Sequence, residues 1–261
     1  MANIPTARWH LLPRSVAPWL IVLVILGLLT LGTTARLARQ SLQQPTPAPP
    51  HSVWIIGDSI TRGLYASSES ATYRALLFRG LAERYPAQIY TTFWQGVCTL
   101  GRLEQRWGQW PGQPDILFLE LGINDVSRNP NCPQVPVSEW AQRYGAMLDR
   151  IRRDAPGVTI VVGTLPWPGW KPGTKRYQTA LQFNRWIREA AAQRNIAVAD
   201  LWEVMEGQEH YLSRPDEPSP FPPKYRGDGF HPNDQGHQII AQTFLRAYET
   251  ALTGTRSQIR R

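Results

Sequence analysis

Two short segments at opposite ends of the chain carry a hydroxyl, a carboxylate and an imidazole that could act together. Ser59 follows the apolar run VWII and Gly57, so its hydroxyl is expected on a tight turn at the end of a strand. Asp228 and His231 lie three residues apart in the segment DGFH. At this spacing the carboxylate can orient the imidazole, which can then take a proton from a serine. Together they predict a serine nucleophile for acyl transfer. Taken singly, GDS is a common helix cap and DxxH a structural hydrogen bond.

Two further segments could supply donors for the oxyanion of such a reaction. Gly96 comes shortly after the segment at 89–94, which has the character of a strand. A glycine there lets a backbone N–H approach a ligand closely. Asn124 lies in the segment GIND, directly after the run ILFLEL, and carries an amide donor. The structural alternatives are a turn glycine and a turn-capping asparagine.

Apolar runs and helical spacings alternate along the chain and predict the elements that position these residues. The sequence predicts helices at 69–84, 137–153, 177–194 and 232–252, with a mixed segment at 100–110. It predicts strands at 53–56, 89–94, 116–121, 158–162 and 196–201. This alternation indicates an α/β fold with a parallel sheet covered on both faces. Ligands bind such sheets at the carboxyl ends of the strands, where all four segments are expected.

The ordered blocks GDSIT, a glycine after the second strand, GIND and DGFH together resemble the SGNH/GDSL hydrolase superfamily over residues 53–252. The resemblance implies a three-layer α/β/α sandwich with a flavodoxin-like, parallel, five-stranded sheet. It implies that Ser59 is the nucleophile, His231 the base and Asp228 the carboxylate of a triad. Ser59, Gly96 and Asn124 would form the oxyanion hole. The glycine block is the least distinctive of the four, and Gly101 is the alternative to Gly96.

The resemblance implies a carboxylic ester hydrolase that forms an acyl-enzyme and needs no metal or cofactor. An O-acyltransferase would use the same serine and pass the acyl group to a sugar hydroxyl instead of water. A non-catalytic, envelope-binding protein could also retain the fold. The expected substrate is a short acyl or acetyl ester, on a small molecule, a carbohydrate or an envelope polymer. The sequence leaves the oligomeric state open.

Aromatic side chains gather in two loops that are expected near the strand ends. Trp167 and Trp170 follow the fourth predicted strand, and Tyr225 precedes the DGFH segment. These rings could stack on a sugar or cover an acyl chain. They could equally pack the loops against the rest of the domain.

Cys98 and Cys132 follow the second and third predicted strands, whose loops should converge on the oxyanion hole. Outside the cytoplasm the two thiols could form a disulfide. Two unpaired thiols are the alternative. The sequence has only these two cysteines, which excludes a disulfide-rich miniprotein and a CxxC-type zinc site.

The beginning of the chain predicts a location outside the cytoplasm. Residues 16–35 lack charge and are long enough to cross a bilayer, which predicts a membrane anchor after a cytoplasmic segment at 1–15. A cleaved signal peptide is the alternative, and the catalytic domain is extracytoplasmic, in the periplasm or outside the cell, in either case. A proline-rich linker at 36–52 leads to the domain at 53–252, and a basic tail at 253–261 follows.

Composition separates this chain from several other classes of protein. With 42% hydrophobic and 10% aromatic residues it is too apolar for a disordered chain. The net charge of +8 raises the question of nucleic acid, but the 28 lysines and arginines are scattered along the chain. Nucleic-acid binding is therefore not expected.

Overall fold

Strands form where the sequence has short apolar runs bounded by glycine or polar residues. The computed structural model describes residues 52–85, 91–216 and 227–258, which belong to one compact unit. Its strands are β1 (Ser52–Gly57), β2 (Thr91–Gly96), β3 (Ile116–Leu119), β4 (Thr159–Gly163) and β5 (Ala197–Ala199). All neighbouring pairs are parallel, in the order β2-β1-β3-β4-β5. β2 lies on one side of β1, and β3, β4 and β5 lie on the other, so the order of the strands reverses at β1. The loops after β1 and β3 therefore diverge and leave room for a ligand.

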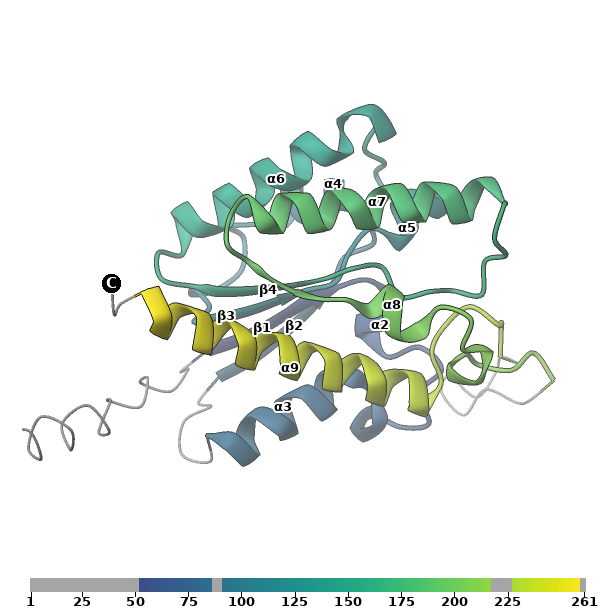
Figure 1. Ribbon diagram of the computed structural model, residues 1–261, viewed down its shortest axis with the longest axis horizontal. Coiled ribbons are helices and arrows are strands. Elements are labelled where there is room, and N and C mark those ends of the chain that lie inside the picture. Colours follow the sequence, from purple (N-terminus) through teal and green to yellow (C-terminus); the bar gives the residue numbers. More distant parts are fainter. Residues whose placement is uncertain (1–51, 86–90, 217–226, 259–261) are drawn as a thin grey trace, which may run out of the picture. The chain divides into compact units, whose positions relative to one another are not determined.

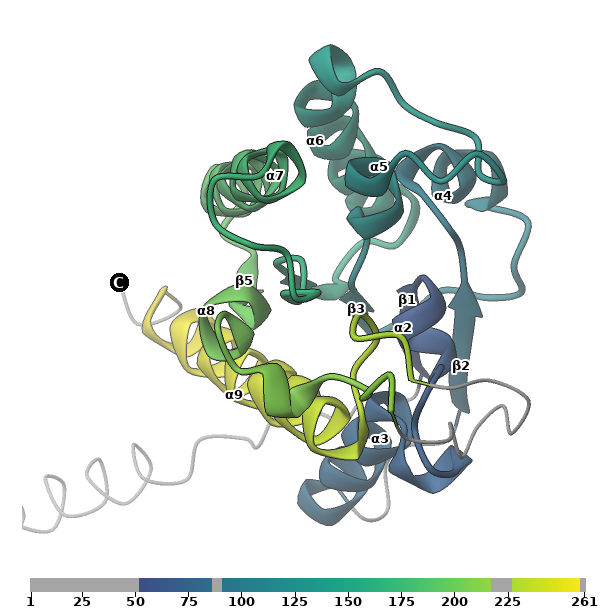
Figure 2. The same cartoon turned by 90° about the vertical axis from the view of Figure 1, so that its right-hand side faces the viewer.

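Helices cover both faces of this sheet. Those that follow the first two strands are α2 (Ser59–Arg62), α3 (Tyr73–Arg84) and α4 (Leu100–Arg106), with a 3₁₀ turn η1 (Glu69–Ala71) before α3. The later ones are α5 (Ile123–Ser127), α6 (Val137–Asp154), α7 (Lys175–Ala192), α8 (Leu201–Met205), a 3₁₀ turn η2 (Glu209–Tyr211) and α9 (Asp234–Gln258). Figures 1 and 2 show α4, α6 and α7 on one face and α3 and α9 on the other. The arrangement confirms the predicted three-layer α/β/α sandwich.

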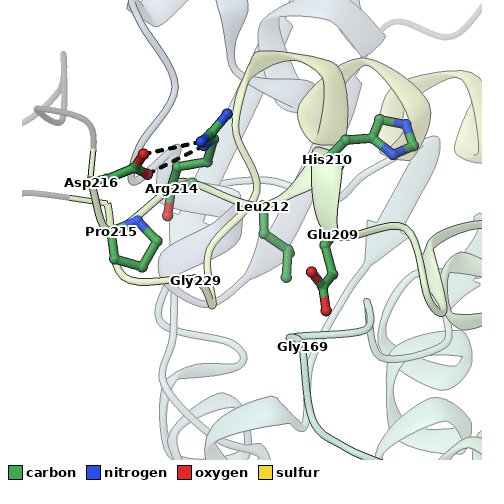
Figure 3. A pocket seen from close by; sticks show the side chains of 9 residues that line it. Gly169, Glu209, His210, Leu212, Arg214, Pro215, Asp216 and Gly229 are labelled. Carbon is green, nitrogen blue, oxygen red and sulfur yellow. Dashed lines mark hydrogen bonds and ion pairs between the residues drawn. The ribbon is translucent and has the colours of Figure 1, made fainter.

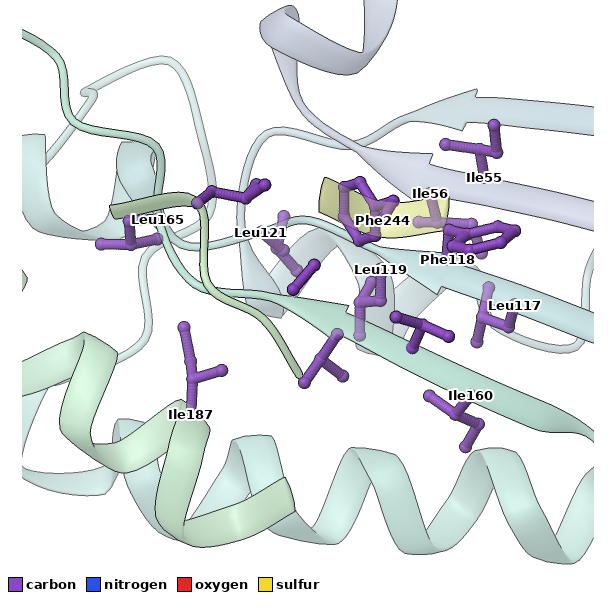
Figure 4. Packing of buried hydrophobic residues seen from close by; sticks show 14 of the residues in the cluster. Ile55, Ile56, Leu117, Phe118, Leu119, Leu121, Ile160, Leu165, Ile187 and Phe244 are labelled. Atoms are coloured by element: carbon purple, nitrogen blue, oxygen red, sulfur yellow. The ribbon is translucent and has the colours of Figure 1, made fainter. Parts of the chain in front are cut away.

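The core lies in two layers, one on each side of β1, β3 and β4. Because parallel strands are buried on both faces, their residues are almost continuously apolar. Phe244 of α9 meets Phe118 of β3 edge to face, with ring centroids 5.6 Å apart. On the opposite side Ile187 of α7 packs toward β3 and β4 (Figure 4). The two layers hold the strand ends in fixed register, and these ends carry the candidate site.

The observed elements differ from the predicted ones mainly at their ends. The predicted helix at 69–84 is interrupted at Thr72, whose extended backbone ends η1 and whose hydroxyl caps α3. The predicted strand at 196–201 is shorter, because Asp200 caps an additional helix, α8. The final helix continues beyond 252 to Gln258, so it enters the predicted basic tail.

The predictions for the beginning of the chain fall on residues that the structure leaves undescribed. The segments at 1–15, 16–35 and 36–52 lie outside the described residues, except that Ser52 begins β1. Within the described residues, no helix has the length and apolar character needed to cross a membrane.

Candidate active site

Ser59 is the first residue of α2 and follows a turn that requires glycine at position 57. A Cβ atom on Gly57 would lie 1.9 Å from Thr61 Oγ1 and 2.5 Å from the carbonyl oxygen of Glu120. The side chain of Asp58 caps α2, because its Oδ1 accepts a hydrogen bond of 2.9 Å from Ile60 N. The turn therefore holds Ser59 at the carboxyl end of β1, where the prediction had it.

The DGFH segment brings its imidazole to Ser59. His231 Nε2 lies 2.8 Å from Ser59 Oγ, and His231 Nδ1 lies 2.6 Å from Asp228 Oδ2. The other carboxylate oxygen, Oδ1, accepts hydrogen bonds of 2.9 Å from the backbone N–H groups of Phe230 and His231. Gly229 has φ +65°, which lets the segment turn tightly enough for these bonds. The three side chains form one continuous hydrogen-bonded chain.

Asp228 is held in its ionised form. Partial burial by itself raises the pKa of a carboxyl group, but the hydrogen bonds and charge of His231 outweigh it. The pKa of Asp228 therefore lies well below its ordinary value. An ionised Asp228 accepts a hydrogen bond from the Nδ1–H of His231 and so leaves Nε2 free to accept a proton from Ser59.

The two predicted oxyanion donors lie on either side of the Ser59 turn. Gly96 ends β2 and pairs with Gly57 in the register of the sheet, one residue before the turn begins. Asn124 lies in α5, and its Nδ2 is 3.4 Å from Asp58 Oδ2. By contrast, Gly101 lies within α4, where a Cβ would meet the carbonyl of Pro133 at 3.0 Å. The strand-end position makes Gly96 the better of the two glycines.

Two buried acidic side chains, Asp58 and Glu120, lie near the Ser59 turn, and neither was predicted as part of the site. Burial raises the pKa of Asp58 to about 6, although the Ile60 N–H and the charge of His231 act in the opposite direction. Burial, with the neighbouring Asp58 carboxylate, also raises the pKa of Glu120 well above its ordinary value. These shifts favour the protonated form of Glu120, whereas Asp58 with a pKa of about 6 stays mainly ionised at neutral pH.

Tyr65 and Ser213 also contact the hydrogen-bonded chain, and neither was predicted. The Tyr65 ring stacks on the imidazole of His231, with centroids 5.2 Å apart, and its backbone is left-handed with φ 68°. A bulky residue in that conformation is strained, a feature common near functional sites. Ser213 Oγ donates to Asp228 Oδ1 at 2.9 Å, and Ser213 N donates to the carbonyl of His231. No sequence spacing signals either contact.

His237 is fully buried in α9. Its Nδ1 accepts a hydrogen bond of 3.3 Å from Tyr73 N, and its Nε2 lies 3.4 Å from the carbonyl of Leu64. Burial lowers the pKa of His237 to about 4, with small contributions from nearby charges of both signs. The neutral ring thus ties α9 to the segment that follows α2.

The buried His237 predicts a loss of stability in acid. The pKa is about 6.5 in the unfolded chain and about 4 in the folded one, so the unfolded chain takes up the proton first as pH falls. Relative to His237→Gln, the native chain should lose roughly 3 kcal/mol of unfolding free energy between pH 7 and pH 4. Urea denaturation of both proteins across this range measures the difference. A difference that stays constant with pH would contradict the burial of a neutral ring.

Cys98 and Cys132 form a disulfide, with their Cα atoms 5.8 Å apart. It joins the loop after β2 to the segment after α5, so it ties together the chain that follows Gly96 and the chain that follows Asn124. Thr99 Oγ1 donates to the carbonyl of Pro133 at 2.6 Å and reinforces the same junction. Of the two alternatives that the sequence left open, the structure has the paired one.

Removal of the disulfide should destabilise the fold. The bond closes a loop with a sequence separation of 34, for which loop-closure entropy gives about 3 to 4 kcal/mol. The double variant Cys98→Ser, Cys132→Ser should therefore have a correspondingly lower free energy of unfolding in urea. Treatment of the wild-type chain with a reductant should give the same decrease. No decrease in either experiment would show that the bond does not stabilise the fold.

The three loop aromatics have different surroundings. Trp167 is 5% exposed and belongs to the core, which agrees with the packing alternative for this ring. Trp170 is partly buried and meets the ring of Phe230 edge to face at 6.0 Å. Tyr225 lies outside the described residues. The Phe230 ring in turn contacts the imidazole of His231, so it lies between Trp170 and His231.

A pocket of about 490 Å³ lies beside the turn that carries Asp228. Its described lining includes Gly229, Leu212 and Gly169 together with polar side chains of the segment after η2 (Figure 3). Arg214 and Asp216 form an ion pair at its wall. Among the described residues no group of three or more acidic, histidine or cysteine side chains could hold a metal ion.

The fold resembles solved esterase structures. An acetylxylan esterase from Geobacillus stearothermophilus is 21% identical with a TM-score of 0.58, over 77% of this chain and 95% of that one. A second acetyl xylan esterase is 18% identical with a TM-score of 0.58, over 75% and 98%. An α/β hydrolase enzyme from the metagenome of Lake Arreo, Spain, is 22% identical with a TM-score of 0.58, over 77% and 96%. At these identities the likeness shows the fold alone.

A family model decides the classification. No curated protein matches the sequence. The model of the GDSL-like lipase/acylhydrolase family, however, matches residues 55–239 and so includes all four motif blocks. The match confirms the family that the motifs resemble and an enzyme of the carboxylic ester hydrolase class. The chain belongs to the GDSL-like lipase/acylhydrolase family.

Proposed function

We propose that the chain is a serine esterase that removes short acyl groups through Ser59, His231 and Asp228. The observation that carries this proposal is the chain of hydrogen bonds from Ser59 Oγ through His231 to Asp228, at 2.8 and 2.6 Å. A hydroxyl, an imidazole and an ionised carboxylate in this order are the parts needed for nucleophilic acyl transfer.

In the proposed reaction, His231 takes the proton of Ser59 as the oxygen attacks the ester carbonyl. Asp228 stabilises the imidazolium that forms. The backbone N–H groups of Ser59 and Gly96 and the amide of Asn124 hold the tetrahedral oxyanion. The alcohol leaves with the proton of His231, and the acyl group remains on Ser59. Water then attacks the acyl-enzyme with His231 as base, which releases the carboxylic acid and restores the hydroxyl.

The proposed substrate is a short acyl ester, acetyl above all, on a carbohydrate or an envelope polymer. Two of the similar structures are described as acetylxylan esterases, which supports a sugar ester as substrate. We also propose that residues 16–35 anchor the enzyme, with the catalytic domain outside the cytoplasm. The disulfide supports this location, since such bonds persist in oxidising compartments.

Incubation of the full chain with p-nitrophenyl acetate, with and without a soluble glycan, tests the proposed function. The esterase proposal expects acetate and p-nitrophenol in equal amounts in both mixtures, because water accepts the acyl group. Acetylated glycan as the only product, formed only when glycan is present, would favour an O-acyltransferase. No release of p-nitrophenol above the rate in buffer would contradict both.

Asn124→Ala should lower kcat about 10²- to 10³-fold, with a smaller effect on KM. The expectation follows from the loss of one donor to the oxyanion, which is charged only in the transition state. Steady-state kinetics with p-nitrophenyl acetate measure both constants. Asn129→Ala is the matched control, because Asn129 Nδ2 donates to Asn124 Oδ1 at 3.2 Å and orients the amide without reaching the oxyanion. A larger loss in Asn129→Ala than in Asn124→Ala would contradict the assigned role.

A further inference from the structure

Trp94 combines unusual exposure with a place beside the candidate site. It lies in β2, which forms one edge of the sheet next to β1 and α2 (Figure 2). Its exposed fraction is 37%, whereas Trp54, Trp107, Trp140 and Trp202 are buried. Exposure of one indole is by itself ordinary, so its immediate contacts decide whether it has a role.

The ring of Trp94 is held in place by a buried arginine. The guanidinium carbon of Arg74 lies 4.0 Å from the ring centroid, and Arg74 is only 5% exposed. Arg74 Nε donates to the carbonyl of Thr61 at 3.0 Å, Nη2 donates to that of Arg62 at 3.3 Å, and the guanidinium pairs with Glu69. One face of the indole is thus fixed against the end of α2, the helix that begins at Ser59.

Gly96 lies between Trp94 and the Ser59 turn. A Cβ atom on Gly96 would meet only Trp94 Cζ3 at 3.7 Å and the carbonyl oxygen of Asp58 at 3.8 Å, which are ordinary contacts. Gly96 also lacks the left-handed backbone that would call for glycine. Neither packing nor conformation therefore requires glycine here. A glycine at this position keeps a side chain out of the space between Trp94 and the Asp58 carbonyl.

We propose that Trp94 is a stacking platform for the sugar ring of an acylated saccharide, at a subsite next to Gly96. The proposal rests on the proposed esterase function and names the part of the substrate that the site recognises. A flat indole packs against the C–H face of a pyranose and needs no rearrangement when it is already fixed. An acyl chain favours an enclosed apolar pocket, whereas an exposed residue such as Trp94 suits the bulky alcohol portion, which extends into solvent.

Two substrates with the same acyl group separate the sugar from the ester. The specificity ratio is defined as kcat/KM for methyl tri-O-acetyl-β-D-xylopyranoside divided by kcat/KM for ethyl acetate, both followed by acid release. Trp94→Leu should lower this ratio about tenfold, since it removes the flat surface but keeps an apolar side chain. Trp94→Phe should recover most of the ratio. Val137→Ala, which alters an exposed apolar side chain at the start of α6, should leave the ratio as in the wild type.

Other outcomes would overturn the proposal. An equal loss on both acetates would assign Trp94 a structural role. A changed preference for ethyl butyrate over ethyl acetate, with the specificity ratio intact, would make Trp94 a wall of the acyl site. An unaltered ratio in Trp94→Leu would leave it as an ordinary surface residue.

A binding measurement tests the subsite apart from the esterase function. Xylotriose, which carries no ester, is titrated calorimetrically into the full-length Ser59→Ala protein with and without Trp94→Leu. Weaker binding by about tenfold in the double variant supports the platform, even if the wild type hydrolyses no ester. Equal binding by the two proteins, or no binding to Ser59→Ala, contradicts it. Failure of the esterase function alone would instead show as wild-type protein that binds xylotriose and releases no acid.

Discussion

Ser59→Ala is expected to lower kcat for p-nitrophenyl acetate by about 10⁶-fold. The substitution removes the oxygen that forms the acyl-enzyme, and water in its place has no covalent route to the same intermediate. KM should change little, because the backbone N–H of residue 59 and the caps of α2 remain. The Asp58 side chain still accepts from Ile60 N, so the turn is expected to keep its geometry.

Ser68→Ala is the matched control for this loss. Ser68 lies in the loop after α2, is exposed, and has its hydroxyl 2.9 Å from that of Ser70. The control should retain wild-type kcat, and both variants should unfold at wild-type urea concentrations. Wild-type turnover in Ser59→Ala would contradict the role of Ser59 as the nucleophile. Equally low turnover, at the rate in buffer, in both the variant and the wild type would favour the non-catalytic, envelope-binding alternative.

Asp228→Asn should lower kcat/KM about 10⁴-fold without unfolding the protein. An asparagine side chain can offer its N–H₂ group to Nδ1 of His231, which places the imidazole proton on Nε2. A ring in that tautomer cannot accept the proton of Ser59. The hydrogen bonds from Phe230 N, His231 N and Ser213 Oγ to residue 228 need only an oxygen, so the turn can persist in the variant.

The control for Asp228→Asn is a carboxylate with a purely structural ion pair. Asp149 of α6 pairs with Arg194 at 2.7 Å and lies on the face of the sheet covered by α6 and α7. Asp149→Asn should leave kcat/KM within about twofold of wild type, since exposed pairs contribute little. A similar rate for Asp228→Asn and the wild type would show that Asp228 does not set the tautomer of His231.

The central strands and long helices could be predicted because their side-chain patterns are unambiguous. The run ILFLEL is buried on both faces of β3, and α6 has its buried residues at helical spacing. Element ends were harder to place, because they depend on caps. Thr72 and Asp200 each divide what the apolar pattern joins, since their side chains accept backbone N–H groups at the start of α3 and α8.

The four motif blocks were predicted at strand ends, and the structure brings them together at one rim of the sheet. For Ser59, Gly96 and Asn124 the alternation of elements was sufficient, because the carboxyl ends of parallel strands meet at the same edge. The DGFH block lies between η2 and α9 and follows no strand directly, so the alternation alone did not place it. His237 lies three residues before Ile240 and seven before Phe244, so helical spacing alone places it on the buried face of α9. Tyr65 and Ser213 left no signal, because a left-handed φ and a contact between distant loops have no periodicity.

Covalent labelling of the purified full chain with a fluorophosphonate tests the central claim most directly. A reactive serine attacks the phosphorus and retains the label, and peptide mass spectrometry identifies the modified residue. We predict a single modified serine, Ser59, and loss of labelling in His231→Ala. A label on another serine, or equally rapid labelling of Ser59 without the imidazole, would contradict the claim that His231 activates Ser59.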